Sequence, residues 1–316
     1  MFALGTVCRV NLYGEGTEEI YGELTDRLSA IEDALSVRIY TSEVSLINRN
    51  AGAGPVAVSA DVMYVIKMAK YFAEKSNGAF DPAIGVLTSL WNIGSDEERV
   101  PTAEEIAAAL PLVDWRKIAL DEDAGTVFLE EPGMKIDLGG IAKGFAADEL
   151  VKILRRHGAP RAVIDLGGNI YMLGKKKDGS PWRVGVKDPA QPQGDVAVTL
   201  ELGENSVVTS GMYERFFEEE GERYHHILDP KTGFPASSGV LSATIVCRSS
   251  LAADALSTAV FILGRDAGLA LLEGGFPEAG VQAEGLVIES GFTVTATEAL
   301  ESALTVQGKN YTRVSS

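Results

Sequence analysis

The segment Lys135-Ile-Asp-Leu-Gly-Gly-Ile-Ala-Lys-Gly144 lies where the pattern of the sequence changes from strand to helix. The apolar run 134–138 predicts a strand, and the paired glycines after it predict a tight turn. Apolar residues then recur on one helical face from Ile141 to His157. A glycine turn before a helix N-terminus favours an anionic ligand, and Lys143 places a further cation there. The alternative is a purely structural turn, and neither GxGxxG nor the P-loop pattern is present.

Upstream of this segment the sequence is mostly helical. A strand over residues 3–13 is followed by an amphipathic helix that begins after the N-cap Thr17 and ends at Leu35. A second helix is expected over 59–76, and a capping box opens a short helix over 102–110. The polar, glycine-containing stretch 40–54 predicts a surface loop.

Downstream the sequence is rich in short strands. These are expected at 118–120, 126–129, 162–165, 170–173, 182–187, 196–202, 206–209, 212–217, 224–228 and 240–248, with two more near the C-terminus. Helices are expected from Ser249 or Ser250 to Leu263 and over 265–272. Interspersed helices and hairpin-like strands predict an α+β fold with a mixed or antiparallel sheet flanked by helices, in a single domain over residues 1–316.

Composition excludes several classes of protein. Of the 316 residues, 46% are hydrophobic and 23% are charged, which is typical of a globular protein with a large core. The 28 Lys and Arg against 45 Asp and Glu give a net charge of −17, so general nucleic-acid binding is not expected. No apolar run approaches the ~20 residues of a transmembrane helix.

The two cysteines and the N-terminus bear on the cellular compartment. Cys8 and Cys247 are far apart in the sequence, so neither a disulfide framework nor a zinc site is expected, and both are predicted to be buried. No signal peptide precedes the first strand. The protein therefore either stays inside the cell or has lost a leader, and the sequence does not distinguish these.

Asp254 and Thr258 are one turn apart on a helix that is otherwise apolar. A carboxylate in such a helix requires compensation, which a hard divalent cation such as Mg²⁺ would supply. The alternative is that Asp254 bonds to backbone near the helix N-terminus and Thr258 to its own helical turn.

Two further segments carry candidate site residues. His225 and His226 end a strand beside the turn Asp229–Gly233, and neighbours on a strand point to opposite faces, so at most one faces a given site. Phe80 and Trp91, with Asp81, are candidates to line a pocket for a flat ring. In both segments the alternative is ordinary packing.

These segments, taken in order, resemble the FAD:protein FMN transferase family, often called ApbE. The matching stretches cover over four-fifths of the chain: Ala3–Thr6, Tyr40–Asn48, Gly78–Pro82, Leu90–Asn92, Ile136–Asp148, Asp165–Asn169, Trp182–Gly185, Thr209–Tyr213, His226–Gly233 and Ala253–Thr258.

The resemblance implies an enzyme that uses Mg²⁺ and cleaves the pyrophosphate of FAD. It attaches FMN through a phosphoester to a Thr or Ser hydroxyl of an acceptor protein and releases AMP. The implied metal ligands are Asp254, Thr258 and the main-chain oxygen of Gly140, and the implied base is His226. The implied FAD contacts are Leu4, Tyr40, Ala79, Phe80, Asp81, Asp137, Lys143 and Leu228.

Two departures from the family pattern concern the FAD contacts. The family usually has Met where this chain has Leu4, and some members have an acidic residue where it has Lys143. The resemblance also implies an acceptor in a membrane redox complex or another flavinylated protein. It implies a place on the extracytoplasmic face of the membrane if a leader was removed, and otherwise in the cytoplasm.

Two other functions use many of the same residues. An FAD pyrophosphatase would use water in place of the acceptor hydroxyl and yield free FMN and AMP. A non-catalytic flavin-binding protein would need no metal at the pyrophosphate, so the presence of both Asp254 and Thr258 favours an enzyme.

Overall fold

The computed structural model describes residues 1–191, 195–308 and 310–315, which form two compact units. Unit 1 contains residues 1–30, 142–211 and 238–316, and unit 2 contains residues 31–141 and 212–237. Helix α1 (Glu18–Leu35) runs from the first unit into the second, and Thr17 caps it, as the sequence predicts. The prediction of an α+β fold with a mixed sheet is confirmed, and the single domain stays a prediction.

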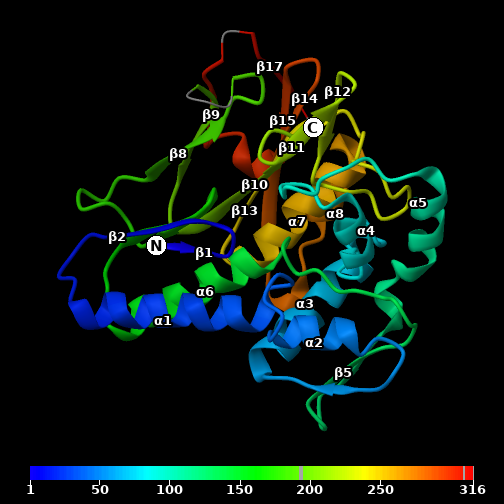
Figure 1. Cartoon of the computed structure of the whole chain (residues 1–316). Helices are drawn as coiled ribbons and strands as arrows, with labels where there is room; N and C mark the ends of the chain where they lie inside the picture. Colours follow the sequence, from blue (N-terminus) through cyan, green and yellow to red (C-terminus); the bar gives the residue numbers. More distant parts are fainter. Residues whose placement is uncertain (192–194, 309, 316) are drawn as a thin grey trace. The chain divides into compact units, whose positions relative to one another are not determined.

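Unit 1 is built on a nine-stranded sheet, in which the order is β1-β2-β6-β7-β10-β13-β14-β15-β17 (Figure 1). All neighbours are antiparallel except β15 and β17. The strands are β1 (Phe2–Ala3), β2 (Thr6–Leu12), β6 (Ala162–Leu166), β7 (Asn169–Leu173), β10 (Asn205–Gly211), β13 (Val240–Cys247), β14 (Ala283–Glu289), β15 (Thr293–Ala296) and β17 (Thr312–Ser315).

A second sheet in unit 1 has the order β16-β9-β8, formed by Leu304–Val306, Val196–Leu202 and Trp182–Lys187. Inward side chains of this sheet, such as Val198 and Leu200, form one core cluster with Val207, Leu286 and Ile288 of the large sheet. Helices α6 (Ala142–Arg156), α7 (Ser250–Leu263) and α8 (Arg265–Glu273) complete the unit, and α7 packs on β10 and β13.

Unit 2 is mostly helical. Its helices are α2 (Glu43–Arg49), α3 (Ala60–Lys75), α4 (Gly85–Trp91) and α5 (Ala103–Ala109). Its sheets are β3-β5-β4, formed by Val56–Ala57, Thr126–Leu129 and Ile118–Asp121, and the hairpin of β11 (Phe216–Glu219) and β12 (Glu222–His225). Short 3-10 turns occur at Leu110–Leu112 and Trp115–Lys117 here, and at Pro277–Ala279 and Glu298–Leu300 in unit 1. The capping box that begins α5 is confirmed with both of its hydrogen bonds.

Several sequence predictions are wrong in detail. The first strand is interrupted at Leu4 and Gly5, which both have positive φ. The stretch 40–54 contains helix α2, and α4 was not predicted. Residues 212–215 form a turn instead of a strand, and the C-terminal region contains four strands instead of two.

The predicted strand 134–138 does not form either, apart from one bridge between Lys135 and Ile84. The side-chain amide of Asn48 replaces a neighbouring strand, because it accepts the N–H of Ile136 at 2.6 Å and donates to the carbonyl of Ile136 at 2.9 Å. The backbone is satisfied without a sheet, so an apolar run was not enough to make a strand.

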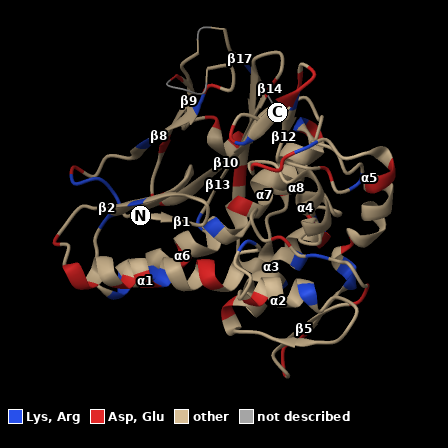
Figure 2. Ribbon diagram, in the orientation of Figure 1, with Lys and Arg blue, Asp and Glu red and all other residues tan. Residues whose placement is uncertain are grey.

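The surface and the cysteines agree with the composition. Figure 2 shows acidic residues along α1, which has six acidic side chains and one arginine. Cys8 and Cys247 are buried, as predicted. Within the described part of the chain, no helix combines the length and the apolar character that crossing a bilayer requires.

Candidate functional site

Asp254 and Thr258 lie on α7, whose first turn is held by α6. The carboxylate of Asp148 on α6 accepts the N–H groups of Ser250 and Leu251 at 2.8 and 3.1 Å and the hydroxyl of Ser249 at 3.1 Å. Ser249 in turn caps the helix by accepting the N–H of Ala252. The donors at the start of α7 are therefore bound within the protein, and the helix presents its residue pair from a fixed position.

Asp254 is buried, with 4% of its surface exposed. Its Oδ2 accepts the N–H of Gly144 at 2.9 Å, and Nζ of Lys143 lies 3.3 Å from its Oδ1. A side chain at Gly144 would place a Cβ 2.2 Å from the carbonyl oxygen of Ser250, so glycine is required where α6 meets α7. The sequence singled out Gly144 and Lys143, but it did not predict that both contact Asp254.

Thr258 has a hydroxyl neighbour that sequence reasoning missed. Ser210, near the end of β10, has its Oγ 2.8 Å from the hydroxyl of Ser257 and 3.4 Å from that of Thr258. Ser210 lies in the stretch Thr209–Tyr213, which matched the family pattern without singling out Ser210. Its position one hydrogen bond from Thr258 makes it a candidate to orient that hydroxyl.

The chemistry of these side chains fits Mg²⁺. A carboxylate and a hydroxyl are hard oxygen ligands, and Mg²⁺ typically takes one or two carboxylates and keeps several waters. Among the described residues, no group of three or more His, Cys, Asp or Glu side chains is arranged to hold a metal. A cation held by Asp254 and Thr258 would therefore not sit in a cage of three or more such side chains.

The carboxyl of Asp148 predicts a pH dependence of stability. Burial raises its pKa to about 6, against the lowering effect of its three hydrogen bonds, and burial likewise raises the pKa of Asp81 in unit 2 to about 6. Each carboxyl therefore holds its proton more tightly in the folded state. The tighter binding of the proton stabilises the folded state fully below about pH 4. As the pH rises through about 6 this stabilisation is lost, and the loss is about 3 kcal/mol for each carboxyl.

In the wild-type protein both carboxyls should lower the free energy of unfolding as the pH rises. The side chain of Asp148→Asn cannot ionise, so in this variant we expect that decrease to be about half as large. Urea unfolding at a series of pH values between about 4 and 8 measures the slope. Asp81→Asn is the matched control, because it should remove the contribution of the Asp81 carboxyl and keep that of Asp148. Equal slopes for the wild-type protein and Asp148→Asn would contradict the prediction.

In unit 2, Asp137 joins two parts of the backbone near the glycine turn. Its Oδ1 accepts the N–H of Gly139 at 2.9 Å, and its Oδ2 accepts the hydroxyl of Thr88 on α4 at 2.8 Å. Thr88 was not predicted, because α4 itself was not. Gly140 follows in the same turn, two residues before the start of α6.

Asp81 shapes the loop that contains Ala79 and Phe80. Its two oxygens accept the N–H groups of Ala83 and Trp115 at 2.8 and 3.2 Å. Ala79 and Phe80 are both buried, and the N–H of Phe80 donates to Ser76. The structure thus gives Asp81 a role in holding this loop, and its predicted contact with FAD stays a prediction.

The two adjacent histidines have different environments. His225 is buried, its Nε2 donates to the carbonyl of Ala236 at 3.1 Å, and its Nδ1 accepts the N–H of Ile227 at 3.3 Å. Burial also lowers its pKa. Both ring nitrogens of His225 are therefore bound within the protein, which assigns it to packing.

His226 is half-buried, and its Nδ1 lies 3.2 Å from the carbonyl oxygen of Arg215. A carbonyl can only accept, so this contact places the proton on Nδ1 and leaves the lone pair on Nε2. A neutral imidazole in this tautomer can take a proton from a hydroxyl. Of the two candidate histidines, His226 is the one suited to act as a base.

The remaining predicted residues differ in their exposure. Tyr40 is 74% exposed, so its ring is accessible, and the guanidinium of Arg49 lies over one face of it, 3.9 Å from the ring centre. Leu228 is buried in a cluster with Trp91, and Leu4 belongs to unit 1. The prediction that Trp91 lines a pocket is wrong, because it is fully buried and its ring nitrogen donates to the carbonyl of Gly233.

The predicted site residues are divided between the units. Unit 1 holds Leu4, Lys143, Asp254 and Thr258, and unit 2 holds Tyr40, Ala79, Phe80, Asp81, Asp137, Gly140, His226 and Leu228. The structure brings together Lys143, Asp254 and Thr258 in the first unit. In the second it places Ala79, Phe80 and Asp81 in one loop, and it ties Asp137 to α4.

Comparison with known proteins identifies the family. The model of the ApbE family matches residues 4–282. The chain belongs to the ApbE family. A relative from Treponema pallidum, named FAD:protein FMN transferase, is 41% identical over 286 residues, which cover 85% of this chain and 79% of the relative. A Klebsiella pneumoniae protein of the same name is 39% identical over 269 residues, which cover 85% and 83% of the two chains.

Solved ApbE structures share the fold. The ApbE protein from Thermotoga maritima has a TM-score of 0.86 at 37% identity, covering 96% of this chain and 97% of its own. The flavin transferase ApbE from Vibrio cholerae has a TM-score of 0.84 at 27% identity, with the same coverage. The fold described above is therefore the ApbE fold over almost the whole chain.

Proposed function

We propose that this chain is an FAD:protein FMN transferase that requires Mg²⁺ and transfers FMN to a Thr or Ser hydroxyl of an acceptor protein. Membership of the ApbE family and the names of its relatives support flavin transfer. The observation that carries the assignment of a phosphoryl-transfer enzyme is the buried carboxylate of Asp254 with the hydroxyl of Thr258 one turn away. A protein that only binds FAD would need neither the carboxylate of Asp254 nor the hydroxyl of Thr258.

The reaction moves the FMN phosphoryl group between two oxygens. The acceptor hydroxyl oxygen forms a bond to the phosphorus of the FMN half, and the bond from that phosphorus to the bridging oxygen breaks, so AMP leaves with that oxygen. Nε2 of His226 takes the hydroxyl proton, because its Nδ1 proton is already donated to Arg215. Transfer of this kind depends mostly on positioning and charge stabilisation.

Asp254 and Thr258 would hold the cation, which when bound neutralises charge on the pyrophosphate and on the departing AMP. The main-chain oxygen of Gly140 remains the third predicted ligand. Tyr40 offers an exposed aromatic ring for the isoalloxazine, and an aromatic face suits a flat ring system. The contacts of FAD with Leu4, Ala79, Phe80, Asp81, Asp137, Lys143 and Leu228 are proposed on the same basis.

The decisive experiment is transfer to protein. The chain is co-expressed with candidate acceptor proteins in a host that lacks its own flavin transferase. Covalent flavin is then detected as fluorescence in a denaturing gel and as the mass gain of one FMN phosphoester. Rapid multiple-turnover release of AMP from FAD and Mg²⁺ alone, without modified protein, would instead identify a pyrophosphatase. Flavin binding without AMP would identify a binding protein.

Lys143 provides a test of the metal site that does not depend on activity. Its ammonium lies 3.3 Å from Asp254, so it competes with a cation for that carboxylate and also repels it. We expect Lys143→Met to tighten Mg²⁺ binding by about tenfold, measured by calorimetry without FAD. Lys152→Met, at an exposed position of the same helix, should leave the affinity unchanged. Weaker Mg²⁺ binding in Lys143→Met would contradict the assignment.

The acceptor and the location follow from the family and stay proposals. We propose an acceptor that belongs to a membrane redox complex or is another flavinylated protein. The reaction would take place at the extracytoplasmic face of the membrane if a leader is removed from the protein, and otherwise in the cytoplasm.

A further inference from the structure

The hairpin β11–β12 in unit 2 has a backbone edge with unused hydrogen-bonding groups. Arg215 and His226 stand opposite each other, and the N–H of His226 donates to the carbonyl of Arg215 at 3.1 Å. In an antiparallel pair such hydrogen-bonded positions alternate with positions whose backbone groups point outward. The register pairs Phe216 with His225 and Glu218 with Arg223, so the outward groups of β11 are those of Phe216 and Glu218.

These outward groups have no backbone partner within the part of the chain that the structure describes. β11 pairs only with β12, so its other side is an open strand edge. Such an edge is a template on which an extended polypeptide adds a strand.

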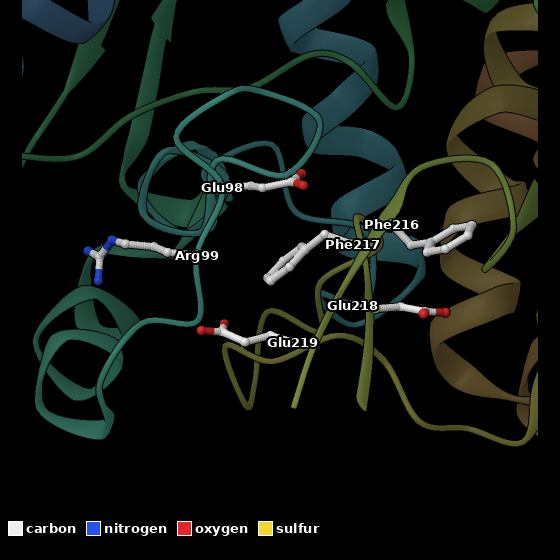
Figure 3. Close-up of a pocket in the computed structure, with 6 residues that line it drawn as sticks. All are labelled: Glu98, Arg99, Phe216, Phe217, Glu218 and Glu219. Atoms are coloured by element: carbon white, nitrogen blue, oxygen red, sulfur yellow. The ribbon is translucent and has the colours of Figure 1, made fainter. Parts of the chain in front are cut away.

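A groove lies along this strand. A cavity of about 550 Å³ is lined by the four residues of β11 and by Glu98 and Arg99, and we call it the β11 groove. Figure 3 shows the ring of Phe217 pointing toward the segment that carries Glu98 and Arg99, with Glu219 on the same side. Phe216 is on the opposite side and is 39% exposed.

The groove is acidic. On the side toward which Phe217 points, the carboxylates of Glu98 and Glu219 are opposed by the cation of Arg99. Glu218 points to the other side of β11, where it pairs with Arg223 at 3.0 Å. The guanidinium of Arg99 is held by both oxygens of Glu105, at 2.7 and 2.8 Å, so its charge is already matched outside the groove. A chain that lies here would complement the groove with Lys or Arg beside Glu98 and Glu219, and with an apolar side chain at Phe217.

The groove begins beside the candidate base. Phe216 follows Arg215 directly, and the carbonyl of Arg215 accepts both the N–H and the Nδ1–H of His226. A strand added to β11 therefore runs directly toward the residue that would take a proton from an acceptor hydroxyl. Binding of a partner and positioning of the proton acceptor depend on the same hairpin.

We propose that the acceptor polypeptide binds as an extended strand on the edge of β11, with basic residues beside the hydroxyl that receives FMN. This inference rests on the proposed transferase function and adds to it the surface and the chemical character of the partner. The main-chain N–H and carbonyl groups of Phe216 and Glu218 supply the pairing, and Glu98 and Glu219 supply the charge preference.

A proline substitution tests the strand edge. Glu218→Pro removes an N–H that points outward, so the hairpin keeps its own hydrogen bonds, and proline is tolerated at such edge positions. Glu218→Ala is the matched control, because it removes the same side chain and keeps the N–H. We expect the KM for an acceptor peptide to be about tenfold higher in Glu218→Pro than in Glu218→Ala. FAD affinity and acceptor-independent AMP release should be the same in both.

The probes are synthetic peptides with one central threonine flanked by Lys, Ser or Glu, scored by the mass gain of one FMN phosphoester. We expect the Lys-flanked peptide to have a kcat/KM about tenfold above that of the Glu-flanked peptide. Glu219→Lys should abolish this preference. Glu15→Lys, which makes the same charge change at an exposed position of unit 1, should keep it.

Each result decides the inference separately from the function. Equal KM values for the two Glu218 variants, or a preference for the Glu-flanked peptide, would overturn it. So would a failure to modify any peptide by a preparation that attaches FMN to an acceptor protein in the co-expression assay. A preparation that cleaves FAD to AMP but modifies neither protein nor peptide would overturn the proposed transferase function. A preparation that binds no FAD and releases no AMP would instead overturn the proposed function.

Discussion

His226→Ala should lower the rate of FMN transfer by about 10²–10⁴-fold, the usual contribution of a positioned acid or base. The tautomer fixed by Arg215 leaves Nε2 as the proton acceptor, and alanine offers none. FAD affinity should change little, because the histidine acts on the acceptor hydroxyl. The measurement is single-turnover formation of FMN-protein, with FAD binding followed in parallel by flavin fluorescence.

Two controls separate chemistry from structure. His157→Ala, at the remaining histidine, which pairs with Glu23, should transfer at the wild-type rate. His225→Ala should lower stability, because both of its ring nitrogens bond to buried backbone. A wild-type rate in His226→Ala would remove it as the base.

Asp254→Asn should weaken Mg²⁺ binding and lower the rate of transfer by about 10²–10³-fold. The substitution keeps the shape of the side chain and removes its charge, so a cation bound there loses the carboxylate of Asp254. Several kcal/mol of charge stabilisation depend on a bound cation, which corresponds to a loss of this size. Calorimetric titration with Mg²⁺ and the Mg²⁺ dependence of the rate measure the two effects.

A surface carboxylate supplies the control for Asp254. Asp266 lies on α8 and is exposed, so Asp266→Asn should leave both the Mg²⁺ affinity and the rate unchanged. Thr258→Val should show a smaller loss than Asp254→Asn, because a neutral hydroxyl is the weaker ligand. Unchanged Mg²⁺ affinity in Asp254→Asn would contradict the metal site.

The sequence predicted those parts of the fold that rest on local patterns. The helices α1, α3, α6 and α7 follow from apolar periodicity and caps, and each is close to its expected range. Helix α4 was missed because Gly85 and the preceding Pro82 are typical of a turn. Gly85 is required there for a different reason, since a Cβ would come 2.7 Å from the carbonyl oxygen of Lys135.

The prediction of a strand at 134–138 was wrong, because a local pattern carries no information about partners that are distant in the sequence. Asn48, which replaces the strand partner of Ile136, is 88 residues away in the sequence. The same limit applies to the site. Local spacing paired Asp254 with Thr258, but Lys143 and Gly144 are more than a hundred residues from Asp254 and contact it only through the packing of α6 on α7.

The histidine pair needed the structure for the same reason. Alternation on a strand predicts that only one of the two faces a site. It does not say which one, because that depends on the distant carbonyls of Ala236 and Arg215. The resemblance named His226, and the hydrogen bonds provide a physical reason for that choice.

Helix α6 has a consequence for protein engineering. Its N-terminal half supplies Gly144 and Lys143 to Asp254, and Asp148 to the start of α7. The two helices therefore have to be kept together, since α7 moved alone to another scaffold would lose the contacts that α6 makes with its first turn and with Asp254. Designers who wish to retune the enzyme should vary the loops around these helices and keep the inter-helix contact at Gly144 intact.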